Sequence, residues 1–313
     1  MGKTYEELYD KLIGEKFRAS IIKYDPQSKR YKYCGYSHKV EENALDNLSE
    51  MIINDMVFYA FTEKEIVKLN DNIQILSDLR SAAKYAYVER LPKRLNSKSD
   101  GTMGEVLLDI FIQLSSTNTK KLVARAKHTE MNSRKEITGY DALYFTIEGN
   151  EKYLWLGQAK AGQKKYCKKS IVEDLQVKYK KEYFADTAFY IADKNEAKEL
   201  ENLLEEINKV CYFAQIKKWN STQKIDELVD VLVNNNVKLR IPCLISYTQD
   251  IYNDKDKLEQ FIIAEMNDII SEFDIKVFPI DIGLDYEITF YILPVKDVDY
   301  IRDKIVDLKK EVV

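Results

Sequence analysis

Hydrophobic and polar residues along the chain follow two spacings, one helical and one strand-like, which together predict a mixed α/β protein. Over residues 41–91 apolar side chains recur every three to five positions, so two or three helices with one buried face are expected there. A short helix over 4–13 comes first, followed by strand-like segments 17–24 and 30–36 around the turn at Asp25-Pro26. The N-terminal part is therefore expected to be a hairpin followed by helices.

The middle of the chain predicts a helix, three strands, another helix and a further strand. Pro92 and the polar run 96–101 interrupt the preceding helical pattern. The predicted segments are then a helix at 102–114, strands at 121–127, 140–147 and 152–161, a helix at 168–184 and a strand at 187–192. The second and third strands are joined by the turn at 148–151, so they are expected to form a hairpin.

The remaining third of the chain also alternates helical and strand-like patterns. The predicted elements are helices at 196–212 and 224–235, a strand at 237–247, a helix at 257–273, a strand at 286–293 and a helix at 297–310. From residue 237 onward the order is strand, helix, strand, helix. The pattern leaves open whether this part is a separate domain.

Composition places the chain among ordinary globular proteins. Of its 313 residues 45% are hydrophobic and 32% are charged, with a formal net charge of −4, which excludes a histone-like polycation and a disordered chain. No apolar run reaches the roughly 18 to 20 residues of a membrane helix, and the N-terminus carries acids where a signal peptide has its apolar stretch. We therefore expect a cytoplasmic protein with no membrane partner. Its four cysteines are too far apart for a zinc site or a disulfide framework, and free thiols are expected at Cys34, Cys167, Cys211 and Cys243.

Charge is unevenly distributed along the chain. Residues 120–181 contain fifteen Lys and Arg against seven Asp and Glu, whereas residues 250–311 contain sixteen acids against eight bases. The basic segment is expected to attract polyanions such as nucleic acid. The acidic segment either repels nucleic acid, meets a basic partner or is simply solvated.

The predicted hairpin brings together three side chains that could support hydrolysis of a phosphodiester. Asp141 opens its first strand, while Gln158 and Lys160 lie two apart near the end of its second strand and so share one face. Hard cations such as Mg²⁺ take oxygen ligands, which Asp141, Gln158 and the carbonyl of Ala159 could provide. A nearby lysine can orient or deprotonate water and offset charge on a phosphate. The alternative is an ordinary surface hairpin with a polar end.

A second carboxylate and a group of lysines flank this hairpin. Glu105 lies in the preceding helix, where it is either a further metal ligand or the last residue of a capping box that begins at Thr102. Four lysines follow the second strand at the start of the next helix, and we expect them to bind the DNA backbone: Lys164, Lys165, Lys168 and Lys169.

Three motifs resemble a known nuclease core. Gly104-Glu105 in a helix, then residues 139–142 (GYDA) and 154–160 (LWLGQAK) in a hairpin, resemble the PD-(D/E)xK nuclease superfamily. In detail they are similar to the HamA family, the nuclease subunit of Hachiman anti-phage defence systems, and to the related AbpA-like proteins. The similar part, 103–192, is under a third of the chain, and its αβββαβ order is the order of that core. The resemblance implies a hairpin and helical region at 1–95, a nuclease core at 96–195 and a C-terminal α/β region at 196–313.

The resemblance also implies roles for individual residues. Glu105 and Asp141 would bind Mg²⁺ or Mn²⁺, position 158 would supply a third ligand, and Lys160 would be the catalytic lysine. The family pattern favours Glu at position 158, whereas this chain has Gln, which lowers the charge of the ligand set. Some nucleases of this superfamily work with QxK, and a Glu-to-Gln change is also used to trap substrate, so both origins stay open.

The implied function is a metal-dependent DNA endonuclease with little sequence specificity, an antiviral defence effector controlled by a superfamily-2 helicase partner of the HamB type. One alternative is a catalytically impaired nuclease-fold subunit that binds DNA or the helicase without cleaving. Cleavage of RNA by the same core is a third possibility.

Overall fold

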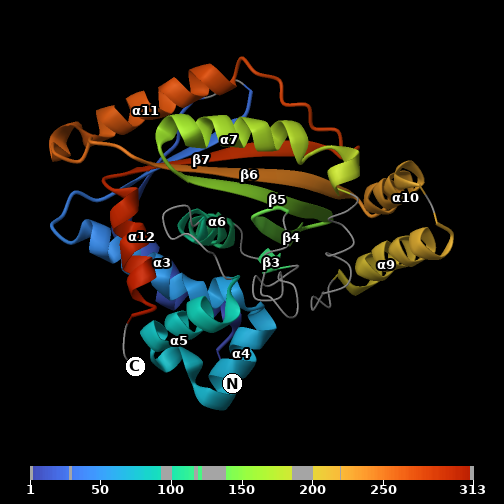
Figure 1. Cartoon of the computed structure of the whole chain (residues 1–313), viewed down its shortest axis with the longest axis horizontal. Helices are drawn as coiled ribbons and strands as arrows, with labels where there is room; N and C mark the ends of the chain where they lie inside the picture. Colours follow the sequence, from blue (N-terminus) through green and yellow to red (C-terminus); the bar gives the residue numbers. More distant parts are fainter. Residues whose placement is uncertain are drawn as a thin grey trace.

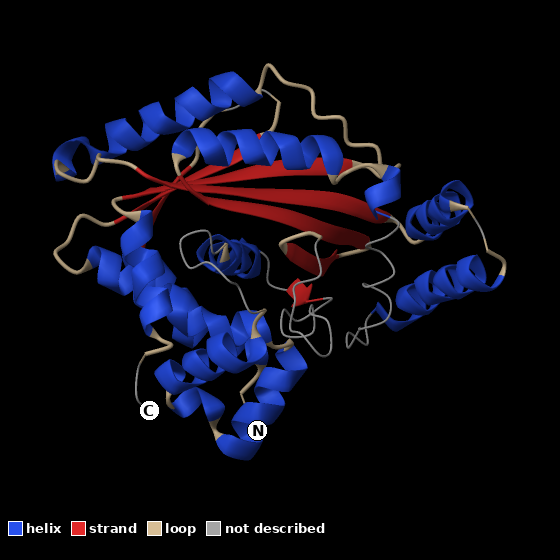
Figure 2. Cartoon of the chain, in the orientation of Figure 1, coloured by secondary structure: helices blue, strands red, loops and turns tan. Residues whose placement is uncertain are grey.

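The computed structural model describes residues 3–27, 30–92, 101–115, 119–121, 139–184, 200–218 and 220–310. These residues form a mixed sheet between two layers of helices (Figure 1). Figure 2 shows the strands crossing the middle of the molecule, with helices on both faces. The protein is therefore an α/β protein, as the spacing of its hydrophobic residues predicts.

The sheet has seven strands among the described residues, in the order β1-β2-β7-β6-β5-β4-β3. Their bounds are β1 Ile21–Tyr24, β2 Lys32–His38, β3 Thr119–Lys121, β4 Ala142–Glu148, β5 Glu151–Gly162, β6 Val237–Thr248 and β7 Tyr286–Val295. The four central strands β2, β7, β6 and β5 run parallel, while β1, β4 and β3 are antiparallel to their neighbours. Strands from the N-terminal, middle and C-terminal regions therefore share one sheet.

One face of the sheet packs against the N-terminal helices and the last helix. These are α1 Tyr5–Tyr9, a π-helical turn Asp10–Gly14, α2 Glu15–Ser20, α3 Ala44–Ala60, α4 Glu63–Ile73, α5 Leu79–Tyr85, α6 Thr102–Ser115 and α12 Val298–Asp307. Thirteen of the seventeen residues of α3 are buried, because this helix packs between the sheet and the outer helices. This hydrophobic core holds α6 against β5, where the candidate site lies.

The remaining helices share a second hydrophobic core with the other face. The helices α7 Lys164–Val177 and α11 Leu258–Phe273 lie over this face, while α9 Glu201–Ile216 and α10 Ser221–Asn234 lie at the end of the sheet where β6 begins (Figure 1). Both faces of β6 are covered, which explains the long apolar run of that strand. The helices α7 and α11 follow the parallel strands β5 and β6 and lie side by side over one face (Figure 1).

Most predicted elements are confirmed, with shifted ends. The N-terminal hairpin pairs β1 with β2, but residues 17–20 continue the first helical stretch instead of joining the strand. The helix after β5 begins at Lys164, four residues before the predicted start. The predicted strand at 187–192 lies outside the described residues, and the strand paired in parallel with β5 is β6.

Two further expectations concern cysteines and membranes. All four cysteines are buried and unpaired, as their spacing predicts. Among the described residues, no helix combines the length and the apolar character that a membrane crossing requires.

Candidate active site

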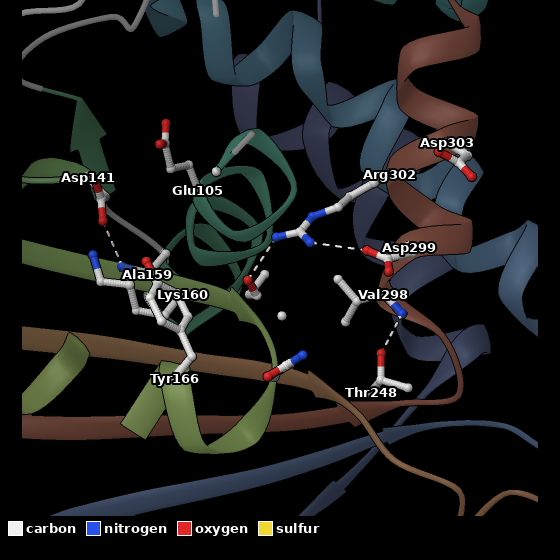
Figure 3. A pocket seen from close by; sticks show the side chains of 14 residues that line it. Glu105, Asp141, Ala159, Lys160, Tyr166, Thr248, Val298, Asp299, Arg302 and Asp303 are labelled. Atoms are coloured by element: carbon white, nitrogen blue, oxygen red, sulfur yellow. Dashed lines mark hydrogen bonds and ion pairs between the residues drawn. The ribbon is translucent and has the colours of Figure 1, made fainter. Parts of the chain in front are cut away.

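A pocket of about 830 Å³ opens where β5 ends and α7 begins (Figure 3). Its walls come from the start of α6, the approach to β4, the last residues of β5, the first turn of α7 and the start of α12. In sheets with parallel strands, ligands commonly bind at the carboxyl ends of the strands. The pocket occupies that position and includes three predicted site residues, Glu105, Asp141 and Lys160.

Of two glycines at the contact between α6 and β5, only Gly157 is needed for their close approach. A Cβ atom on Gly104 would meet the Cβ atoms of Ala159 and Ala161 at 3.5 Å, which is ordinary contact. A Cβ atom on Gly157 would lie 2.9 Å from the Cβ of Ala142 and 2.9 Å from Cδ2 of Leu108 on α6, closer than real Cβ atoms approach. The bare backbone at Gly157 therefore sets the distance between the helix that carries Glu105 and the strand that carries Lys160.

Glu105 is held inside the protein by a tyrosine. Its side chain is 6% exposed, and Oε2 accepts a hydrogen bond of 2.7 Å from the Tyr59 hydroxyl on α3. The amide of Glu105 donates to the carbonyl of Gly101, so Thr102 is the first residue of the helix and not the residue before it. In a capping box that begins at Gly101 the acid would be at position 104, so Glu105 lies one residue too far along the helix to be the capping-box acid.

Asp141 lies directly before the start of β4 and is hydrogen-bonded to β5. Its amide donates to the carbonyl of Gly157 at 2.9 Å, and its Oδ2 accepts a hydrogen bond of 2.8 Å from the amide of Ala159. Burial and the charge of Glu105 raise the pKa of Asp141, whereas the charges of Lys160 and Lys178 oppose that rise. Two carboxylates therefore face the same pocket and repel each other. A bound cation would offset this repulsion.

Gln158 and Lys160 lie on one face of β5, as predicted, but they have different surroundings. Lys160 lines the pocket, and its Nζ lies 2.6 Å from Oδ2 of Asp174 on α7. Gln158 is fully buried and does not line the pocket, and its Oε1 accepts a hydrogen bond of 2.7 Å from Nζ of Lys178. The structure therefore brings together Glu105, Asp141 and Lys160, and directs Gln158 toward Lys178 instead.

The acidic neighbours of Lys160 favour its protonated form. Burial lowers the pKa of Lys160, but the charge of Asp141 and the hydrogen bond and charge of Asp174 outweigh it, so the pKa lies above its usual value. The side chain is therefore an ammonium near neutral pH.

Four further residues belong to this region that the sequence reasoning did not identify: Tyr59, Asp174, Lys178 and Arg302. Arg302 reaches into the pocket from α12 and donates to the carbonyl of Ala161 at 2.8 Å (Figure 3). Asp174 and Lys178 are four apart on the helix after the QxK strand, a spacing that marks an ion pair. That spacing was the available signal; nothing local indicates Tyr59 or Arg302, because both come from distant elements.

The predicted DNA-binding lysines divide into two pairs. Lys164 lies 2.7 Å from Glu265 and 2.7 Å from Asp268 on α11, and Lys168 lies 2.6 Å from Glu272. These two lysines therefore balance acids of the acidic C-terminal segment. Lys165 and Lys169 are exposed, and Lys169 forms a 3.6 Å surface pair with Glu173. Surface pairs of this kind contribute little energy, so these two lysines are open to solvent and to a ligand.

The donor set of the pocket suits a hard divalent cation. Mg²⁺ is commonly held by one or two carboxylates together with water and substrate phosphate, and Glu105 and Asp141 provide two carboxylates. Over the described part of the chain, no cluster of three or more His, Cys, Asp or Glu side chains is arranged to enclose a metal. The residues thus fit an open Mg²⁺ or Mn²⁺ site and do not form a closed structural one.

Comparison with known proteins adds one finding. Neither the curated proteins nor the solved structures contain a match to the chain. A family model described as HamA matches residues 11–308, which is nearly the whole chain and includes every element around the pocket. The chain therefore belongs to the HamA family.

Proposed function

We propose that the chain is a metal-dependent DNA endonuclease of the PD-(D/E)xK type that cleaves phosphodiesters with little sequence specificity. Membership of the HamA family makes it a component of a Hachiman anti-phage defence system. In that setting the nuclease is the effector, and a superfamily-2 helicase of the HamB type controls it. The observation that carries the proposal is the meeting of Glu105, Asp141 and Lys160 in one pocket.

The order of elements around the pocket supports the same proposal. A helix with an acid, α6, precedes the antiparallel strands β3, β4 and β5, and α7 follows. The strand β6 then pairs with β5 in parallel. This order supports the proposed αβββαβ core, in which β6 would serve as the last strand. The strand expected at 187–192 lies outside the described residues.

Each residue has a distinct part in the proposed reaction. Glu105 and Asp141 would hold Mg²⁺ or Mn²⁺. When bound, the ion would favour ionisation of an attacking water and offset the negative charge that develops on the phosphate. The Lys160 ammonium lines the same pocket and can donate hydrogen bonds to a phosphate oxygen or to water. Tyr59 limits the rotation of Glu105 through its hydrogen bond.

Contacts with DNA would be made mainly by backbone phosphates. Lys165 and Lys169 on the first turns of α7 are exposed and adjoin the pocket wall at Tyr166. Asp299 and Asp303, at the opposite rim on α12, would disfavour DNA on that side. A partner that covers these acids would therefore ease entry of DNA, which is how we propose that the helicase exerts control.

The test is cleavage of supercoiled plasmid in Mg²⁺ or Mn²⁺ against EDTA, with and without the helicase. We compare the unmodified chain with Lys160→Ala, Asp141→Asn and the control Lys181→Met, a lysine outside the pocket that pairs with Asp226 at 3.6 Å. Metal-dependent cleavage should fall by about 10²-fold or more in the two pocket variants and stay unchanged in the control. Cleavage that survives in both pocket variants would refute the assignment of the site.

One observation favours a second candidate, a nuclease-fold subunit that binds DNA or the helicase without cleaving. Gln158 carries no charge and is engaged with Lys178, so the proposed metal-ligand set has two carboxylates, Glu105 and Asp141, where the family pattern has three. If DNA binds with a marked salt dependence but is not cut even with the helicase present, this candidate replaces the first. Replacing the plasmid by RNA in the same assay tests the remaining substrate class.

A further inference from the structure

A continuous chain of polar contacts runs beneath the pocket, from Gln158 to Lys160 through two residues of α7. Nζ of Lys178 donates to Oε1 of Gln158 at 2.7 Å and lies 3.2 Å from Oδ1 of Asp174. The other carboxylate oxygen of Asp174 lies 2.6 Å from Nζ of Lys160. One carboxylate is therefore shared by two lysines, and only one of these lysines, Lys160, lines the pocket.

The fold fixes this chain of contacts firmly. Lys178 directly follows the last residue of α7, and its carbonyl accepts a hydrogen bond of 2.7 Å from the hydroxyl of Tyr140, the residue before Asp141. The next residue, Tyr179, donates to the carbonyl of Leu156 on β5 at 2.8 Å. The end of α7 is thus tied both to the hairpin and to β5, so the ammonium of Lys178 has a defined position.

Little solvent reaches the charged groups. The side chains of Lys160 and Lys178 are each 20% exposed, and that of Asp174 is 17% exposed. Charges in such surroundings are screened less than surface pairs, and removal of one partner leaves the others poorly compensated. Gln158 is fully buried, and its Nε2 has no hydrogen-bond partner among the described residues, so the bond to Lys178 is what orients its amide.

We propose that Asp174 and Lys178 are positioning residues of the site: Asp174 holds the ammonium of Lys160 at the pocket wall, and Lys178 fixes the side chain at position 158. This assignment rests on the proposed nuclease function, because it concerns the same pocket. Neither residue touches the substrate. Both act through Lys160 and Gln158.

The contact with Lys178 determines what a glutamate at position 158 would do. A glutamate at this position would meet the Lys178 ammonium where the amide oxygen now lies, and the two would form an ion pair with little exposure to solvent. Gln158→Glu alone therefore does not release a third carboxylate into the pocket. The carboxylate becomes available only when the charge of Lys178 is removed as well.

The first test separates positioning from general damage. The variants are Asp174→Asn, Lys178→Met and Lys178→Arg, with Glu173→Gln and Lys181→Met as matched controls on the neighbouring surface. In plasmid cleavage we expect kcat to fall about 10- to 100-fold for Asp174→Asn and Lys178→Met, with KM for DNA changed less than about threefold. Lys178→Arg keeps the charge and should recover part of kcat. An unchanged kcat in Asp174→Asn and Lys178→Met, or an equal fall of kcat in the controls, would overturn the assignment.

The second test does not depend on cleavage. Acetic anhydride modifies free amines, and peptide mass spectrometry gives the rate at each lysine. Asp174→Asn should increase the modification of Lys160 several-fold at constant pH, whereas Glu173→Gln should not. An unchanged rate at Lys160 would overturn the positioning role, whatever the activity. Lys178→Arg provides a folded variant if Lys178→Met does not fold.

The third test uses Mn²⁺ binding by calorimetry. Gln158→Glu should bind Mn²⁺ within about threefold of the unmodified chain, and Gln158→Glu with Lys178→Met about tenfold more tightly than Gln158→Glu alone. A full gain from Gln158→Glu alone would overturn the role of Lys178. If the unmodified chain neither binds Mn²⁺ nor cleaves DNA while the lysine modification responds as expected, the proposed nuclease function has failed and the contact network is structural only.

Discussion

Replacing Gly157 by alanine should damage both stability and the site, whereas the same change at Gly104 should not. A Cβ atom at Gly157 would lie 2.9 Å from the Cβ of Ala142 on β4, 2.9 Å from Leu108 on α6 and 3.1 Å from the ring of Pro242 on β6. Two of these neighbours belong to strands on either side of β5, so they can withdraw only if the sheet opens.

The magnitude follows from these contacts. Overpacking of this kind costs about 1–3 kcal/mol. Leu108 can shift its side chain, but Ala142 and Pro242 are held in the strands on either side of β5, which favours the upper end. The reduced freedom of alanine in the unfolded chain returns about 0.5–1 kcal/mol. We therefore expect Gly157→Ala to lower the free energy of unfolding by about 2 kcal/mol. At Gly104 the nearest atoms are 3.5 Å away and the residue is helical, so Gly104→Ala should be neutral or stabilise by up to about 1 kcal/mol.

The assay is urea unfolding of both variants, followed by tryptophan fluorescence and circular dichroism. Cleavage should fall for Gly157→Ala under conditions where the variant is fully folded, because α6 and Glu105 move away from Lys160. If Gly157→Ala unfolds at the same urea concentration as the unmodified chain, the close packing of α6 on β5 does not exist as described. Equal destabilisation by both alanines would refute the distinction between the two positions.

Three further predictions concern individual side chains. Burial lowers the pKa of His38 to about 4, so the folded chain favours the neutral ring. The stability that is present at pH 7 should therefore be lost as the pH falls from 6.5 toward 4, by about 2 kcal/mol between pH 7 and pH 5. An NMR titration that gives an ordinary pKa for His38 would contradict this prediction. Tyr59→Phe removes the hydrogen bond to the buried Glu105. It should lower the free energy of unfolding, measured by calorimetry, by about 1–3 kcal/mol, and cleavage should fall as well. An unchanged melting curve would show that this hydrogen bond does not stabilise the fold. Lys164→Met should lower stability by about 1–2 kcal/mol, because Glu265, which is 16% exposed, loses its ion-pair partner. Lys165→Met should weaken DNA binding, measured by fluorescence anisotropy, and leave thermal unfolding unchanged. The reverse pattern would mean that Lys164 is the DNA contact.

The sequence alone was sufficient for much of the local structure and for the main site residues. The period of apolar residues predicts helices and strands because each element has to bury one face, and the turn at 148–151 predicts which strands pair. Once the hairpin is predicted, alternation along a strand places Gln158 and Lys160 on one face of it. The motifs around Glu105, Asp141 and Lys160 also indicated the family that the chain belongs to.

Only the tertiary structure decided which charges meet. Lys164 and Lys168 look like DNA ligands in the sequence, but the return of the chain through α11 places Glu265, Asp268 and Glu272 against them, about a hundred positions away. The orientation of Gln158 depends in the same way on the end of α7. Periodicity is a property of neighbouring residues, whereas an ion pair depends on the order of strands in the sheet and on the crossovers between them. For this reason the local pattern named the residues that could do chemistry, and the packing of α6, α7 and α12 around β5 determined which of them share the pocket.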